Sequence, residues 1–276
     1  MRGCACRGTA GFAHVSCLAE QANILVTEAE ENNLDSKVFN ERWRRWDACS
    51  LCEQEYHGAV RCALGWACWK TYLGRPEADD LRGMAIGTLG NGLSEAGHDE
   101  DALSVREAEL AMARRIGTDE EGLLTTQSNL ANTYRALGRF EEALSLRRDV
   151  YSATLNLFGS DDGDALLEAN NYGNCLLQLK RFEEVRALSR KMIPVARRVL
   201  GENDDLTLRM RWIYAQSLYL DDDATLDDLR EAVSTLEEIE RTARRVMGGA
   251  HPLTGIIEDD LRDARAALRA RETPSP

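Results

Sequence analysis

Ser128-Asn-Leu-Ala-Asn-Thr-Tyr-Arg-Ala-Leu-Gly-Arg-Phe-Glu-Glu-Ala-Leu144 is the stretch that decides the fold of this 276-residue chain. Its first half places apolar residues on one helical face and ends at a glycine, and its second half begins another such face. The first face consists of Leu130, Tyr134 and Leu137, and the second begins with Phe140, Ala143 and Leu144. The stretch therefore predicts two helices joined by a tight turn.

The same hairpin pattern recurs along the chain at intervals of 41 or 42 residues. A small residue stands at the predicted helix crossing of each copy, at Gly90, Ala131, Gly173 and Ala215. A hydrophobic residue followed by glycine ends each copy, at Ile116-Gly117, Phe158-Gly159, Leu200-Gly201 and Met247-Gly248. The last interval is longer because about five residues are inserted at an acidic turn, where a longer loop costs little.

This period resembles that of the tetratricopeptide repeat (TPR) in the long form found in kinesin light chains. The resemblance rests on the small crossing residues, on the segment Gly138-Arg-Phe-Glu-Glu-Ala143, and on the linker that starts at Met247; it covers residues 78–270. The usual period of the family is about 34 residues, so longer helices and a deeper groove are expected here. The resemblance implies a mainly α fold, a right-handed α-α superhelix (TPR solenoid), whose first helices line a groove for a peptide or protein ligand.

Composition narrows the classes of partner. The chain is 43% hydrophobic and carries a formal net charge of −13, which argues against nucleic acid or an anionic membrane surface as the main ligand. A basic or neutral peptide is the expected partner. No signal peptide is visible, and the most apolar run, residues 59–73, is too short to span a membrane. We therefore expect a cytoplasmic location, with a nuclear one as the alternative.

Seven of the eight cysteines precede residue 69, which favours a metal site over disulfides in a chain without secretory features. Cys4-x-Cys6 and Cys49-x2-Cys52 each present two thiolates from a tight turn, and two such pairs match the tetrahedral preference of Zn²⁺. His14 and Cys17 are spaced as a further half-site. The alternative is that these cysteines are small buried hydrophobic residues.

The order of the six ligands resembles the later part of a RING-CH (RINGv) zinc domain. That resemblance implies one complete zinc site at Cys4, Cys6, Cys49 and Cys52, and half a site at His14 and Cys17. A further C-x2-C pair opens such domains and is missing here, so we expect Met1 to be internal to a longer reading frame. Cys62 and Cys68 are a less favoured way to complete the second site, because they do not share a helical face.

A ladder of carboxamides runs through the predicted groove. Asn91, Asn132, Asn174 and Gln216 occupy the same register in the first helix of each repeat. A carboxamide both donates and accepts, so the ladder could pair with the backbone of a bound peptide. Further predicted peptide-binding residues are Asn129 and Asn170, together with Arg135 and Arg209, which could hold a carboxylate. The alternative is that these amides bond neighbouring helices.

The predicted domain organisation is a truncated RING-CH-like zinc module over residues 1–56, a connecting and capping helix over 57–77, TPR repeats over 78–270, and a disordered tail over 271–276. No catalytic motif is present. The favoured function is a zinc-binding adaptor that holds a protein or peptide in the TPR groove. A ubiquitin ligase that recruits a ubiquitin-conjugating enzyme and a pure structural scaffold are the alternatives.

Overall fold

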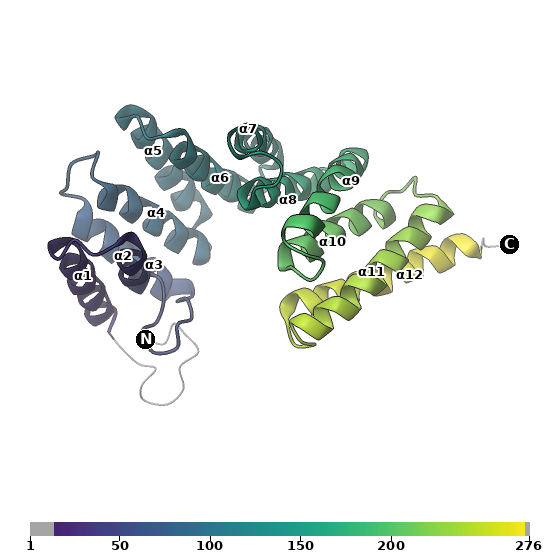
Figure 1. Cartoon of the computed structure of the whole chain (residues 1–276), viewed down its shortest axis with the longest axis horizontal. Coiled ribbons are helices and arrows are strands. Elements are labelled where there is room, and N and C mark those ends of the chain that lie inside the picture. The colour runs from purple at the N-terminus through teal and green to yellow at the C-terminus, as the bar shows by residue number, and fades with distance from the viewer. Residues whose placement is uncertain (1–13, 274–276) are drawn as a thin grey trace. The chain divides into compact units, whose positions relative to one another are not determined.

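The computed structural model describes residues 14–273, which form helices and no named strand (Figure 1). The chain divides into two compact units, unit 1 up to Arg139 and unit 2 from Phe140. Unit 1 holds α1 (Val15–Glu31), α2 (Ser36–Trp43), a short 3₁₀ helix (Arg44–Trp46), α3 (Gly58–Tyr72), α4 (Asp80–Glu95), α5 (Asp99–Ile116) and α6 (Glu120–Ala136). Unit 2 holds α7 (Phe140–Phe158), α8 (Gly163–Gln178), α9 (Phe182–Val199), α10 (Asp205–Tyr219), α11 (Leu226–Val246) and α12 (Pro252–Glu272). The predicted mainly α class with recurring helices is confirmed.

The first helix of each repeat begins at an aspartate. The side chains of Asp79, Asp119, Asp162 and Asp204 each accept a hydrogen bond from a backbone N–H in the first turn of α4, α6, α8 and α10. An N-cap acceptor satisfies one of the donors that a helix start leaves open. These four helices are called A helices below, and α5, α7, α9 and α11 are called B helices.

Several B helices end in an arginine that reaches a loop before an A helix of the same unit. Arg115 contacts Glu77 ahead of α4, with Nη2 2.8 Å from Oε1. Arg198 contacts Asp161 ahead of α8 at 2.6 Å, and Arg245 donates to Oδ1 of Asn203 ahead of α10 at 2.9 Å. A cation near the carboxyl end of a helix also suits the helix dipole. Each of these arginines joins the end of a B helix to the linker that precedes the A helix of the same hairpin.

The N-terminal helices of unit 1 share one core with the first repeat. A single buried cluster joins Val26 of α1, Trp46 of the 3₁₀ helix, Tyr72 of α3 and Leu81 of α4. Helices α3 and α4 approach closely, because a Cβ added at Gly92 would lie only 2.8 Å from the carbonyl oxygen of Arg61. Residues 15–72 are therefore packed onto the repeats.

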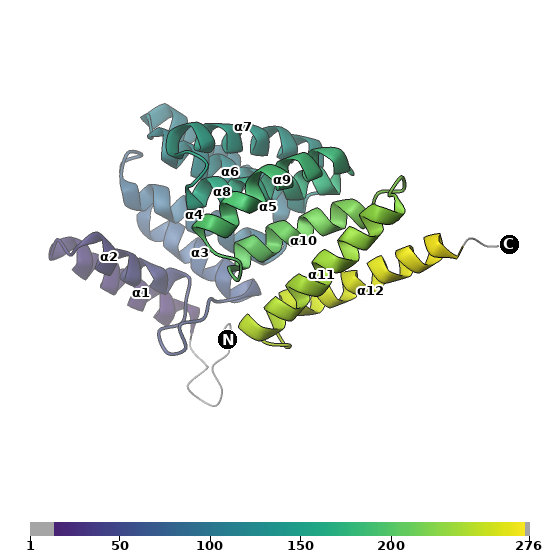
Figure 2. The same cartoon turned by 45° about the vertical axis from the view of Figure 1, so that its right-hand side comes forward.

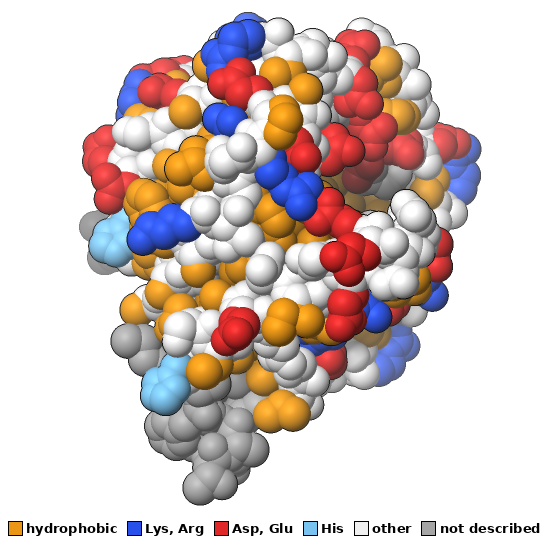
Figure 3. All heavy atoms as spheres, turned by 90° about the vertical axis from the view of Figure 1, so that its left-hand side faces the viewer, with side chains coloured by type: hydrophobic (Ala, Val, Ile, Leu, Met, Phe, Trp, Pro, Cys, Tyr) orange, Lys and Arg blue, Asp and Glu red, His pale blue; other side chains and the backbone are white. Residues whose placement is uncertain are grey.

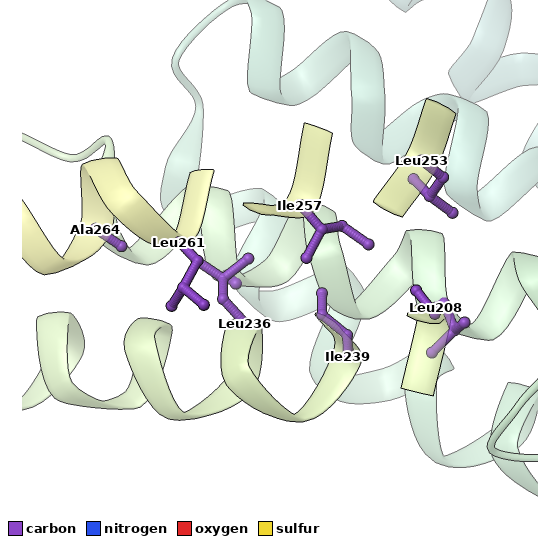
Figure 4. Close-up of a cluster of buried hydrophobic side chains, with 9 residues drawn as sticks. Leu208, Leu236, Ile239, Leu253, Ile257, Leu261 and Ala264 are labelled. Atoms are coloured by element: carbon purple, nitrogen blue, oxygen red, sulfur yellow. The ribbon is translucent and has the colours of Figure 1, made fainter. Parts of the chain in front are cut away.

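Unit 2 is closed by α12, which packs on α11 and α10. Figure 4 shows Ile257 and Leu261 of α12 facing Leu236 and Ile239 of α11, within a cluster that also includes Leu208. All five side chains are buried. Burying each such side chain contributes about 1.5–3 kcal/mol relative to exposure. The last helix is an integral layer of unit 2.

Candidate interaction surfaces

The four ladder residues differ in exposure. Asn91 and Asn132 are exposed, while Asn174 and Gln216 are half-buried. Asn91 and Asn132 belong to unit 1, and Asn174 and Gln216 belong to unit 2. Each unit therefore offers two of these carboxamides from its A helices.

Asn91 is engaged by a buried arginine of the same repeat. The guanidinium of Arg106 donates to Oδ1 of Asn91, and its Nη1 lies 2.7 Å from Oε2 of Glu109. Burial raises the pKa of Glu109, and the charge of Arg106 lowers it. Gly90 leaves room for this guanidinium, because an added Cβ would lie 2.6 Å from Cζ of Arg106. Here the amide bonds a neighbouring helix, as in the alternative interpretation of the ladder.

Gln216 is engaged by the last helix. Its Nε2 donates to Oδ2 of Asp260 at 2.8 Å, and the same oxygen accepts from Nε1 of Trp212 at 2.5 Å. Burial, and after it the charge of Asp260, raises the pKa of Tyr219. The A-helix face of α10 thus already holds a carboxylate that α12 supplies.

The other predicted groove residues occupy varied surroundings. Asn129 is half-buried and Arg135 is exposed. Asn170 is buried, and its Oδ1 has no hydrogen-bond partner among residues 14–273. Nε of Arg209 pairs with Oδ2 of Asp205 one turn earlier on α10, at 2.6 Å. Because Asn132 and Arg135 are three residues apart on α6, they are neighbours on one exposed face of that helix.

Cys49 and Cys52 form a tight knuckle between the 3₁₀ helix and α3. The backbone N–H of Leu51 points at Sγ of Cys49 at 3.4 Å, and the N–H of Cys49 donates to the carbonyl of Gln54 at 2.9 Å. Glu53 follows with a φ of 56°, in the left-handed region. An N–H directed at the first sulfur suits a thiolate, which is the protonation state that binds metal.

Three arginines hold the knuckle. Nη1 and Nη2 of Arg45 pair with the carboxylate of Glu53 at 3.1 and 3.0 Å, and Nη2 of Arg44 donates to the Glu53 carbonyl at 3.1 Å. Nη1 of Arg61, from α3, donates to the carbonyl of Asp47 at 2.7 Å. Burial raises the pKa of Asp47, and the charge of Arg61 opposes that rise. The knuckle is thereby attached to the helix that packs on the first repeat.

His14 and Cys17 lie at the start of α1, with Nδ1 of His14 3.9 Å from Sγ of Cys17. Cys17 is exposed, whereas Val15 and Leu18 pack on the cluster that contains Cys49 and Cys52. Cys17 therefore lies on a different face of α1 from the residues that touch the knuckle. Among the described residues, these two pairs do not come together as a group that could hold a metal ion.

Cys4 and Cys6 lie outside the described residues. Within residues 14–273, no group of three or more His, Cys, Asp or Glu side chains is arranged to hold a metal ion. Cys68 and Cys175 are buried, and Cys62 is half-buried against α4 and α5. In the described part, Cys62 and Cys68 pack in separate clusters and do not meet the His14–Cys17 pair.

Large apolar side chains are exposed on unit 1, among them Leu51, Trp66 and Leu73. On the face drawn in Figure 3, hydrophobic side chains spread over the middle and lower part, while acidic side chains gather at the upper right. Extended apolar patches are typical of interaction surfaces. Among the residues described, no helix combines the length and the apolar content needed to cross a bilayer.

Capped A helices, alternating B helices and a recurring crossing residue define a helical repeat protein. Residues 82–155 match the tetratricopeptide repeat family model. A search of curated proteins finds no significant match.

Two solved structures share the fold. A crystal structure of kinesin light chain TPR-like repeats from Podosopora anserina superposes with a TM-score of 0.56 at 16% identity, covering 86% of this chain and 99% of that one. BtubC (BKLC) from P. vanneervenii gives a TM-score of 0.50 at 16% identity, covering 96% of each chain. The predicted tetratricopeptide character and the likeness to kinesin light chain repeats are confirmed at the level of the fold.

Some residues of these surfaces escaped the sequence analysis. Arg106 and Asp260 determine what Asn91 and Gln216 bind. Arg106 had a signal in the sequence, because Arg147 follows it by the same 41 residues that separate Asn91 from Asn132. The three arginines around the knuckle were likewise unassigned. Arg44 and Arg45 belong to a run of basic residues just before the cysteine pair, whereas Arg61 stands alone in α3.

Proposed function

We propose that this protein is a protein-protein interaction adaptor whose A-helix surfaces bind the backbone of a peptide or protein segment. The observation that carries the proposal is the exposed polar edge at Asn132 and Arg135 in unit 1, with Asn174 at the same register in unit 2. Asn132 and Asn174 supply a donor and an acceptor each, and Arg135 supplies a guanidinium for a carboxylate. Asn91 and Gln216 serve chiefly to bond Arg106 and Asp260.

The test is partner capture with Asn132→Ala and Asn174→Ala, made singly and together. Each change is expected to reduce capture without lowering the helical content measured by circular dichroism. Asn156→Ala is the matched control, because Asn156 is an exposed asparagine on the B helix α7. Unchanged capture by the double variant would reject the ladder as a binding surface.

Zinc is the second part of the proposal. The knuckle at Cys49 and Cys52 fits a thiolate-bound Zn²⁺, because an N–H faces the first sulfur and arginines fix the turn. The sequence resemblance assigns Cys4 and Cys6 as the other two ligands, with His14 and Cys17 as a half-site. Bound zinc would supply structure, since four thiolates leave no open position for a reactant.

Native mass spectrometry with and without a chelator tests this assignment. One zinc per chain is expected, with loss of that zinc in the Cys49→Ser and Cys52→Ser double variant. Cys62→Ser is the control and should keep the metal. A wild-type chain without zinc contradicts the assignment.

The ligase alternative rests on the RING-CH resemblance alone. A reconstituted assay of autoubiquitination on a chain extended upstream tests it, with Cys49→Ala as the inactive variant. The scaffold alternative predicts a mass that rises with concentration in sedimentation.

A further inference from the structure

A second groove lies on unit 2, between the B helices α9 and α11, with α10 as its floor. Figure 2 shows these three helices side by side, and α10 contacts both of the others. Two adjoining cavities of about 270 and 450 Å³ make up the groove and share Arg211 and Glu238 in their linings. We call it the B-helix groove.

One stripe of side chains from each helix forms the walls. The α9 wall carries Arg190, Ile193, Pro194 and Arg197, which are spaced as neighbours on one helical face. The α11 wall carries Glu231, Thr235, Glu238, Arg241, Thr242 and Arg245. From residue 231 to residue 245 this wall is about 21 Å long, the span of about six extended residues.

Five arginines and two glutamates line the groove, and three of the arginines have no carboxylate partner among residues 14–273. Arg197 is paired, because its Nε lies 3.0 Å from Oε1 of Glu202. Arg211 is buried and pairs with Glu238 at 2.5 Å. In the described part of the chain, Arg190, Arg241 and Arg245 have no carboxylate within ion-pair distance. Arg241 donates instead to the carbonyl of Glu237, and Arg245 donates to Asn203. This positive strip stands out on a chain whose formal net charge is −13.

The helix dipole does not account for the whole strip. Its influence is confined to the last turn of a helix. Arg190 lies more than two turns before the end of α9 at Val199, and Arg241 lies more than one turn before the end of α11 at Val246. The positions of these two arginines are therefore not explained by the helix dipole, and they are the residues to substitute in a test of binding.

Pro194 interrupts the backbone hydrogen bonding of the α9 wall. Proline has no N–H, so the helix offers no i→i−4 bond to the carbonyl of Arg190. The acidic side chains of a bound peptide could meet the guanidiniums of the groove. Ile193 and Tyr214 supply apolar surface beside these polar groups.

The B-helix groove is distinct from the A-helix surface. Tyr214 and Gln216 lie two residues apart on α10, about 200° around the helix axis. Tyr214 lines the groove, whereas Gln216 bonds Asp260 of α12. A ligand in one surface leaves the other unoccupied.

We propose that the B-helix groove binds an extended acidic peptide segment of a partner protein. Charge complementarity with Arg190, Arg241 and Arg245 selects the acidic side chains. This inference goes beyond the proposed function, because it uses the opposite face of α10.

Isothermal titration calorimetry with a glutamate-rich peptide of about eight residues tests the proposal. Arg190→Glu with Arg241→Glu is expected to weaken binding about tenfold or more, since two contacts become repulsive. Arg148→Glu with Arg269→Glu is the matched control, because it changes the net charge equally at exposed positions of unit 2 outside the groove. The control should bind the peptide as the wild type does.

Three results would overturn the proposal. The first is equal weakening in both pairs of variants, which would indicate general charge attraction. The second is equal affinity for a lysine-rich peptide or no binding at all. The third is that Asn174→Ala abolishes binding of the peptide while the Arg190→Glu and Arg241→Glu double variant still binds it. That result would place the peptide on the A-helix surface.

Discussion

Gly92 and Gly83 of α4 stand in opposite surroundings. An added Cβ at Gly92 would lie 2.8 Å from the Arg61 carbonyl oxygen and 3.2 Å from Cα of Cys62, whereas at Gly83 nothing lies within 4 Å. Backbone atoms of a packed helix cannot move aside cheaply. Substitution of Gly83 therefore reports on helix propensity alone, whereas substitution of Gly92 in the same helix also reports on packing.

We expect Gly92→Ala to lower the free energy of unfolding by about 1–3 kcal/mol, because it forces α3 away from α4. Gly83→Ala should raise that free energy by about 0.5–1 kcal/mol, because alanine favours the helix and meets no neighbour. Urea denaturation of both variants is the measurement. If both substitutions changed the free energy of unfolding by the same amount and in the same direction, the close contact between α3 and α4 would not explain the effect at Gly92.

Acid should weaken the start of α11. The hydrogen bond from Thr225 lowers the pKa of Asp228, and the hydrogen bond from Arg186 lowers that of Asp221. A carboxyl with a lowered folded-state pKa stabilises the fold above its ordinary value of 3.8, and this contribution is lost as pH falls below it. Unfolding followed from pH 6 to pH 2 should show this loss, and Asp228→Asn should reduce the slope. An unchanged slope contradicts the assignment.

The recurring aspartate is the feature that most clearly marks each A helix. It precedes four helices in two units and bonds the first turn each time. Because the residue sits at a helix boundary, its contribution depends on one side-chain acceptor. In the sequence, the glycines mark the ends of the repeats and these aspartates mark the beginnings of the A helices.

We expect Asp204→Ala to lower the free energy of unfolding by about 1 kcal/mol, because the N–H of Leu206 loses its acceptor. Asp204→Asn is the control, since the amide oxygen can still accept. Thermal denaturation of both variants is the measurement. Equal destabilisation by both changes would mean that charge, not capping, is what Asp204 supplies.

Helix positions followed from the sequence because apolar periodicity and terminal glycines are local signals. The hydrogen-bond partners of the ladder carboxamides could not be predicted from the sequence. Asn91 meets Arg106 from the next helix, and Gln216 meets Asp260, which lies beyond an enlarged acidic turn. Apolar periodicity indicates where the carboxamides lie, but their partners are polar side chains of other helices, which this periodicity does not locate.

At the scale of the whole chain, the cysteine-bearing segment is built into unit 1. Sequence patterns predict a separate module over residues 1–56. The structure shows a core in which Val26 and Trp46 pack with Tyr72 and Leu81. Any ligand that stabilises the knuckle at Cys49 is thereby linked to the helices of the first repeat.

If the proposed zinc is bound, its removal should increase amide hydrogen exchange in α1, α3 and α4. The physical reason is that Arg61 connects the knuckle to α3, which packs on α4. Helices α8 to α12 serve as the internal reference and should exchange at an unchanged rate. A uniform increase over both units, or none, contradicts this coupling.

The tryptophans give each unit its own optical reporter. Four of the five lie in unit 1, at positions 43, 46, 66 and 69, and Trp212 stands alone in unit 2. The indole N–H of Trp212 donates to the carboxylate of Asp260, so the fluorescence of Trp212 should report whether α12 is packed on α10. A chain whose other four tryptophans are replaced by phenylalanine would report by its fluorescence on unit 2 alone.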